Sequence, residues 1–187
     1  MVPVMSLWSP ILLSAVIVFV ASSLVHMVLP FHRNDIRKVT DEDQLLGTLR
    51  RLDLPPGDYV APHAGSAAGM KTPAFLEKVK KGPIVYMRVA PGGSTSMIRS
   101  LALWFLYSVL ISFFSAYVTG RALTFGADYL EVFRFVGTVA FMGYSFALLQ
   151  DSIWSRRSWG TTIKSVIDGL IYGLLTAGTF GWLWPKM

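Results

Sequence analysis

Four ionisable side chains lie inside long apolar runs or at their edges: His26, Asp151, Lys164 and Asp168. Lys164 and Asp168 are four residues apart, so on a helix they share one face. At 1.5 Å per residue, Asp168 lies about 7 Å from the middle of its run. An ionisable side chain at that depth is a functional candidate, as part of a proton or ion relay, a metal or haem site, or a surface that recognises a lipid headgroup.

A structural hypothesis explains the same residues. Lys164 and Asp168 can pair across one helical turn, with the Lys164 ammonium extended toward the membrane surface. His26 can donate a hydrogen bond to a neighbouring helix. The sequence leaves the functional and the structural hypothesis open, and Asp168 is the residue on which they differ.

A metal site generally needs three or more converging ligands. Only His26, Asp151 and Asp168 are placed to supply them, and they lie in three different apolar runs. His32 is expected at the membrane interface, His63 has no second histidine at ligand spacing, and no HExxH motif occurs. We therefore predict no metal site and no resident cofactor, and keep haem or pigment ligation by His26 as a lesser alternative.

The sequence excludes several classes of chemistry. The chain has no cysteine, which rules out disulfides and thiol catalysis, and it has no G-x-S-x-G or Walker A motif. The net charge of +6 does not indicate nucleic-acid binding, because the basic residues that flank apolar runs are explained by the anionic membrane surface. The expected lipid-headgroup anchors are Arg33, Arg37, Lys38, Arg156 and Arg157.

The elements that carry these residues are four membrane-length apolar runs. Apolar residues make up 53% of the chain and charged residues only 15%, and the mean hydropathy is +0.51. Runs of about 20 such residues are long enough to cross a bilayer as helices. The sequence therefore predicts an all-α integral membrane protein with transmembrane helices over Ser9–Leu29, Ser100–Gly120, Val132–Gln150 and Thr162–Trp184.

Basic residues set the expected orientation of these helices. Segment 30–99 contains eleven lysines and arginines against seven acidic residues, and the loop after the third run adds Arg156 and Arg157. Because basic loops remain cytoplasmic, both termini are expected outside and segment 30–99 inside. The expected location is the cytoplasmic (inner) membrane of a bacterium.

Small residues recur every fourth position on two of the runs, and helices pack closely over such faces. These two faces are expected either to pack against each other within the chain or to join subunits of a membrane complex. The residues concerned are Ser108, Ser112, Ala116 and Gly120 on the second run, and Gly169, Gly173, Ala177 and Gly181 on the fourth.

Segment 30–99 separates an N-terminal part, 1–29, from a three-helix part, 100–187. It is expected to form a small, mixed and partly irregular cytoplasmic insertion. An amphipathic helix is predicted before Pro55, capped by Thr40, and a second over Pro73–Gly82. An alternating run after Gly82 predicts one strand, and the stretch between the helices, which begins at Gly57, is expected to be extended or coiled and irregular.

Two functions from different classes follow from these features. The leading hypothesis is a non-catalytic accessory or scaffold subunit of a membrane complex, because catalytic motifs are missing and two helix faces are suited to packing. The alternative is a small transporter or membrane enzyme with an inner-leaflet polar site formed by His26, Asp151, Lys164 and Asp168. The expected partners are the lipid bilayer and other membrane subunits or further copies of the chain.

Overall fold

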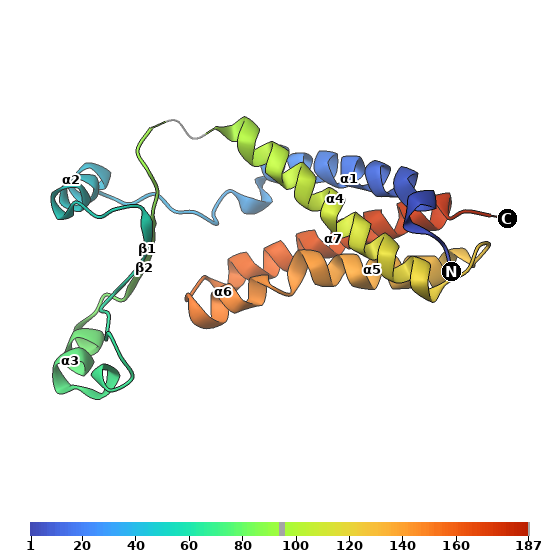
Figure 1. The fold of residues 1–187 in the computed structure, drawn as a ribbon. Helices are drawn as coiled ribbons and strands as arrows, with labels where there is room; N and C mark the ends of the chain where they lie inside the picture. The colour runs from blue at the N-terminus through green and yellow to red at the C-terminus, as the bar shows by residue number, and fades with distance from the viewer. Residues whose placement is uncertain (94–95, 187) are drawn as a thin grey trace. The chain divides into compact units, whose positions relative to one another are not determined.

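The computed structural model describes residues 1–93 and 96–186. The chain is mostly helical, with one small two-stranded sheet (Figure 1). It divides into two compact units, which we describe separately. The first comprises Met1–Ile36 and Ser96–Met187, and the second comprises Arg37–Thr95.

Four helices of the first unit are long and apolar enough to cross a membrane: Val4–Val28, Met97–Ala122, Tyr129–Trp154 and Trp159–Leu183. Each overlaps one of the four predicted runs. These four candidate spans indicate a multi-pass membrane protein. The first begins at Val4 rather than Ser9, because a 3-10 turn over Val4–Leu7 leads directly into the helix.

Two of the four spans are not continuous α-helices. The first span consists of α1, Trp8–Ser23, followed by a π-helical turn over Leu24–Val28. The third consists of α5, Tyr129–Ser145, and α6, Leu148–Trp154. The other two spans are the continuous helices α4, Met97–Ala122, and α7, Trp159–Leu183.

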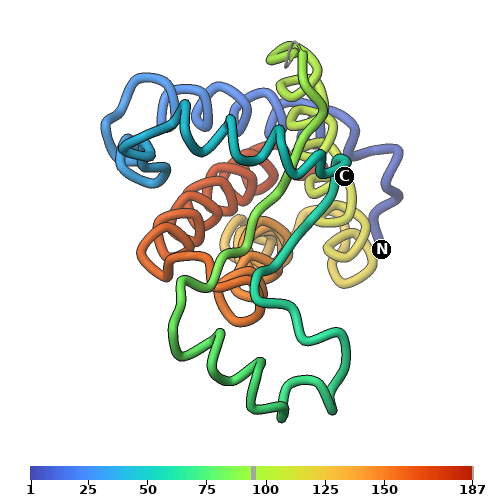
Figure 2. Tube along the Cα trace, turned by 90° about the vertical axis from the view of Figure 1, so that its left-hand side faces the viewer, coloured from blue at the N-terminus to red at the C-terminus, as the bar shows by residue number. Residues whose placement is uncertain are grey.

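The four long helices form one bundle in which each packs against two neighbours, in the order α1, α4, α5, α7. Figure 2 looks along this bundle, with α1 in blue, α4 in yellow-green, α5 in orange and α7 in red. The contact between α5 and α7 is the most extensive. Buried residues of all four helices, with Val2 and Leu7 ahead of them, make the larger apolar cluster of the core: Val2, Leu7, Ile11, Ala116, Val132, Val136, Ala177, Phe180 and Trp184.

The small-residue face of α7 packs on α5. A Cβ atom built on Gly173 would lie 3.1 Å from the Phe141 backbone nitrogen, and one on Gly181 would lie 2.6 Å from the Tyr129 ring. Ala177 is fully buried, with its Cβ against Gly137. The glycines therefore allow the two helices to approach each other more closely than side chains would permit.

The small-residue face of α4 packs on α1 and the residues before it. Ser14 Oγ donates to Ser112 Oγ over 3.0 Å, and the Val2 amide donates to the Gly120 carbonyl over 2.7 Å. A Cβ atom at Gly120 would come within 2.5 Å of the Val2 carbonyl oxygen. The prediction that the α4 and α7 faces pack against each other is therefore wrong: each takes its main partner from a neighbouring helix of the bundle.

The described part of the second unit contains two short α-helices, a 3-10 turn over Gly69–Lys71 and one sheet. Helix α2 covers Glu42–Leu52 and α3 covers Pro73–Lys81, with Thr72 capping α3 as its side chain accepts from the Phe75 amide. The cap of α2 differs from the prediction: Asp41, not Thr40, accepts from the Gln44 amide, because it is the residue directly before the first helical turn.

The sheet pairs β1, Gly57–Ala61, with β2, Val85–Val89, in antiparallel register from Gly57 opposite Val89 to Ala61 opposite Val85. Strand β2 lies in the predicted alternating run. Strand β1 lies at the start of the stretch that was predicted to be extended or coiled, without a pairing partner. The prediction of a single strand was incomplete, because a strand needs a partner for its backbone hydrogen bonds.

Candidate functional site

Five ionisable side chains gather where α1 ends and α7 begins: His26, His32, Asp35, Lys164 and Asp168. His26 lies in the π-helical turn that ends the first span. The backbone then becomes extended at Leu29, and Pro30 opens a 3-10 turn that ends at His32. This change of direction brings His32 and Asp35 back against α7, where Lys164 and Asp168 lie one turn apart on the same face.

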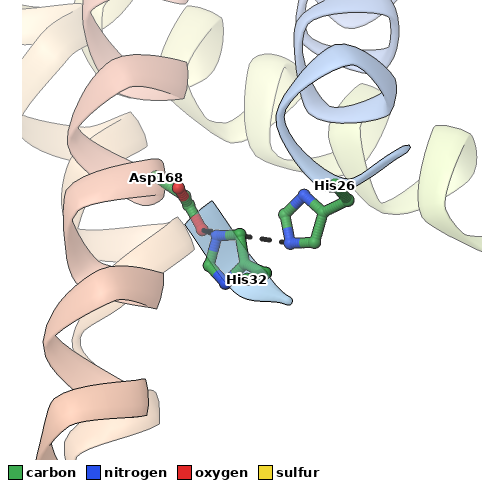
Figure 3. A group of neighbouring side chains, drawn as sticks. All are labelled: His26, His32 and Asp168. Carbon is green, nitrogen blue, oxygen red and sulfur yellow. Dashed lines mark ion pairs between the residues drawn. The ribbon is translucent and has the colours of Figure 1, made fainter. Parts of the chain in front are cut away.

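Asp168 is at the centre of the cluster and is only 3% exposed. Its Oδ2 atom lies 2.8 Å from His32 Nε2 and 3.9 Å from His26 Nε2 (Figure 3). Its Oδ1 atom has no hydrogen-bond partner among the described residues. A buried carboxylate oxygen without a partner is costly, so this position is suited to a group that the protein itself does not provide.

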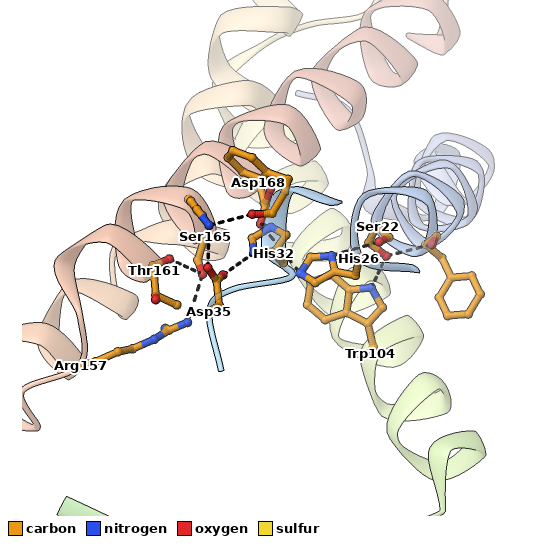
Figure 4. A network of polar contacts seen from close by, with 12 residues as sticks. Ser22, His26, His32, Asp35, Trp104, Arg157, Thr161, Ser165 and Asp168 are labelled. Carbon is orange, nitrogen blue, oxygen red and sulfur yellow. Dashed lines mark hydrogen bonds and ion pairs between the residues drawn. The ribbon is translucent and has the colours of Figure 1, made fainter. Parts of the chain in front are cut away.

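Asp35 links the second histidine to the lysine. Its Oδ2 accepts from His32 Nδ1 over 2.6 Å (Figure 4). Its Oδ1 accepts from Lys164 Nζ over 2.7 Å. Lys164 also donates to the Phe31 carbonyl over 2.7 Å. The hydrogen bonds from Lys164 and then His32 lower the pKa of Asp35 below its ordinary value, so this carboxylate is ionised at neutral pH.

His26 is held differently from His32. Its Nδ1 lies 3.1 Å from the Ser22 carbonyl oxygen one turn earlier, and its side chain is half exposed. The His26 and His32 rings stack with centroids 4.4 Å apart and an interplanar angle of 5°. Trp104 of α4 donates from Nε1 to Ser22 Oγ over 2.8 Å, so the same turn of α1 is also tied to α4.

A cavity of about 470 Å³ opens beside this cluster, between α1, α4, α5 and α7. Aromatic and aliphatic side chains form most of its wall, and His26, Ser165 and Asp168 form a polar part. Tyr172 Oη is buried in the wall and has no hydrogen-bond partner in the described part of the chain. The other lining residues are Ser22, Ser23, Met27, Leu101, Trp104, Tyr107, Tyr144, Leu148 and Gly169.

A second cavity, also about 470 Å³, is likewise lined by His26. Most residues that line it are polar or charged, among them two arginines, Arg33 and Arg157, and the Arg157 guanidinium donates to Ser165 Oγ over 3.2 Å. The remaining lining residues are His32, Asp35, Ile36, Ser158 and Thr161. Since His26 and Ser165 line both cavities, an apolar space and a basic polar space meet at these two side chains.

The structure brings together three of the four residues predicted for a polar site. His26 and Asp168 are in the cluster, and Lys164 joins it through Asp35. Lys164 extends away from Asp168 to Asp35, and the pairing expected between Lys164 and Asp168 is not among the ion pairs of residues 1–93 and 96–186. Asp151 does not line either cavity: its side chain is exposed on α6, and its backbone carbonyl accepts from the Arg157 amide.

His32 and Asp35 were missed as site residues. A usable signal was present, since His26 lies in the last turn of a span and His32 and Asp35 follow within ten residues. Of the expected headgroup anchors, Arg33 and Arg157 line the polar cavity, and Arg156 is exposed beside Arg157. The other two, Arg37 and Lys38, belong to the second unit.

Comparison with known proteins found no matching family model, no similar curated protein and no similar solved structure.

Proposed function

We propose that this chain is a membrane protein that binds an anionic, lipid-like amphiphile and acts on its headgroup at the His26–Asp168 cluster, as a small membrane enzyme or transporter. The observation that carries the proposal is the meeting of an apolar and a basic cavity at His26 and Ser165. An amphiphile likewise has an apolar tail and a polar headgroup, and the junction between the two would lie beside the buried Asp168 carboxylate.

The apolar cavity is suited to the tail of such a molecule. Its volume of about 470 Å³ falls in the range of about 300–1,000 Å³ that small-molecule sites occupy. Its wall is rich in aromatic side chains, among them Trp104, Tyr107 and Tyr144. A hydrocarbon chain gains free energy in such surroundings in proportion to the apolar area it buries.

The polar cavity is suited to a phosphate or carboxylate headgroup. Arg33 and Arg157 supply planar guanidinium groups, which bind such anions through paired N–H donors. Lys164 is already engaged by Asp35, so the arginines are the cations left for a ligand. A headgroup between them would lie next to the imidazole of His26.

The proposal includes the orientation expected from the basic loops. The cluster lies at the ends of the first and fourth spans that adjoin the basic segments, so it would face the cytoplasmic side of a bacterial inner membrane, with both termini outside. A headgroup would then be reached from the inner leaflet.

The accessory-subunit hypothesis remains a second proposal, with less support. One of its motivations was the pair of small-residue faces, and both pack inside the chain, on α1 and α5. Ligation of haem or a pigment by His26 stays a prediction, to be tested by visible absorbance that His26→Ala abolishes.

Binding of dodecyl phosphate to the full chain in mild detergent tests the proposed function. Tryptophan fluorescence reports binding because Trp104 lines the apolar cavity. Arg157→Gln should weaken binding about 10- to 100-fold, the effect of losing one hydrogen bond to a charged group. Arg156→Gln is the matched control, since Arg156 is the exposed neighbour that does not line the cavity.

Two further comparisons make the test decisive. Ser23→Phe fills the apolar cavity and should abolish binding, whereas Ser100→Phe places the same side chain at an exposed position of α4 outside the cavity wall. Dodecyltrimethylammonium, with the same tail and a cationic headgroup, should bind much more weakly. Equal binding of the two amphiphiles, or equal effects of the two arginine variants, would refute the proposed function.

A further inference from the structure

We infer that His26, His32 and Asp168 form a binding site for a divalent transition metal ion, with Asp35 orienting His32. The inference goes beyond the proposed function, since it assigns an ion to the cluster whether or not an amphiphile binds beside it. The sequence had predicted no metal site, because His32 was placed at the membrane interface and only one histidine remained within reach of Asp168.

The donor atoms are close to the separations that a metal ion requires. One nitrogen from each histidine and one oxygen of Asp168 all lie within 4.8 Å of one another. Zinc bonds of about 2.0–2.2 Å to nitrogen and oxygen put the donors of a tetrahedral ion about 3.3 Å apart. The two distances from Asp168 Oδ2, 2.8 Å to His32 and 3.9 Å to His26, bracket that value.

The hydrogen bonds of the two imidazoles leave both Nε2 atoms free to act as ligands. The Ser22 carbonyl can only accept, so His26 Nδ1 carries the proton in that contact. His32 Nδ1 likewise donates to the Asp35 carboxylate. In a neutral imidazole the other nitrogen, Nε2, then presents a lone pair that can bind a metal ion. Histidines that bind metals typically donate their other ring N–H to a carboxylate or a backbone carbonyl, as both of these rings do.

Atoms without partners point to the same site. His32 Nε2 and Asp168 Oδ1 are buried and form no hydrogen bond within the described ranges. His32 Nε2 also lies 2.8 Å from Asp168 Oδ2 without the geometry of a hydrogen bond. A neutral imidazole whose Nε2 lone pair faces a carboxylate oxygen at that distance is repelled unless a positive charge lies between the two atoms, and either a second proton on the ring or a metal ion supplies that charge.

The ligand set indicates the class of ion. Two imidazoles and one carboxylate, with positions left open toward a cavity, are typical of catalytic zinc and of non-haem iron(II) sites. The stacked rings lie in nearly parallel planes with centroids 4.4 Å apart, and each Nε2 lone pair lies in the plane of its own ring, so one ring must turn for both to reach one ion. His26 is half exposed and held by a single hydrogen bond to its own helix, so it is the ring able to turn.

Cobalt(II) titration of the untagged, full-length protein in mild detergent, after removal of metals with a chelator, tests this inference. Cobalt occupies zinc sites and gives visible absorption bands whose intensity reports low coordination number, and zinc should displace it. We expect about one tightly bound ion per chain. Asp35→Asn should weaken binding about 10- to 100-fold, because it removes the group that orients His32.

His26→Ala should abolish the cobalt spectrum, and because His26 is half exposed this variant should still fold. His63→Ala is the matched control, since His63 is the one other histidine of the chain and belongs to the second unit. Absence of a cobalt spectrum from the unsubstituted protein, or equal cobalt affinity in the His26→Ala and His63→Ala variants, would overturn the inference. Dodecyl phosphate binding is measured on the same samples. If the protein binds dodecyl phosphate but not cobalt, the metal-site inference fails while the proposed function stands.

Discussion

Two alanine substitutions on α7, at Gly169 and Gly178, test how closely this helix packs on α5. Both positions are helical, so each change should favour the helix by about 1 kcal/mol through backbone propensity alone. Their surroundings differ. A Cβ atom at Gly178 would lie 3.7 Å from Tyr129 Oη, an ordinary contact distance, whereas one at Gly169 would overlap Ser145 Oγ.

The Ser145 hydroxyl could rotate away from the new methyl group, but the atoms behind it are less free. The added Cβ at position 169 would also lie 3.1 Å from Tyr144 Cβ and 3.3 Å from Ser145 Cβ, and both of these are fixed to the α5 backbone. Relief then requires the two helices to separate. Overpacking of this kind costs about 1–3 kcal/mol.

Thermal denaturation followed by intrinsic tryptophan fluorescence in mild detergent measures the difference. For a chain of this size, Gly169→Ala should melt about 2–12 °C below Gly178→Ala. The comparison between the two variants cancels the helix-propensity gain that they share. Equal melting temperatures, or a higher value for Gly169→Ala, would refute the close packing of α7 on α5 at Ser145.

Two further predictions concern polar contacts. Lys164 and His32 lower the pKa of Asp35 below 3.8, so the contacts of the ionised carboxylate stabilise the fold above that pH and are lost as the pH falls through the lowered pKa. Between about pH 5 and pH 3, the melting temperature of the unsubstituted protein should therefore fall more steeply than that of Asp35→Asn. Parallel curves of melting temperature against pH for the two proteins would contradict this prediction. A double-mutant cycle of Ser14→Ala and Ser112→Ala should give a coupling of about 0.6 kcal/mol for the hydroxyl contact between α1 and α4, and a coupling indistinguishable from zero would show that the contact is not formed.

Hydropathy and length were sufficient to find the four spans, because a run of about 20 apolar residues has few other stable arrangements. The ends of the helices depended on polar contacts that hydropathy does not measure. Helix α4 begins at Met97 rather than Ser100, since the Ser96 hydroxyl accepts from the Arg99 amide and caps an earlier turn. Such a cap is visible in sequence only once the helix boundary is suspected.

Periodicity identified the small-residue faces but not their partners. A face that recurs every fourth residue indicates that something approaches closely, and any of three other helices can be that partner. The choice was made by side chains on the partners: Ser14 offers α4 a hydrogen bond, and Phe141 and Tyr129 of α5 cover the glycines of α7. These complementary contacts depend on the whole bundle, so no single run contains them.

The candidate site was predictable to the extent that it lies on regular helices. The spacing of Lys164 and Asp168 placed both on one face of α7, and helical depth placed His26 near them. His32 and Asp35 reach the same point through the break at Leu29 and the turn that begins at Pro30. The direction of a chain after such a break is set by tertiary contacts, which periodicity does not describe.

The two carboxylates of the cluster indicate which hypothesis for Asp168 has more support. In a purely structural network each buried carboxylate oxygen finds a donor, and Asp35 meets this condition, since Lys164 and His32 take one oxygen each. Asp168 is more deeply buried, yet the lysine one turn away extends to Asp35, and the ion-pair partners of Asp168 Oδ2 among the described residues are two imidazole nitrogens. Because leaving a buried carboxylate so poorly partnered destabilises the fold, its position is better explained by a cation or ligand that the cluster is arranged to hold.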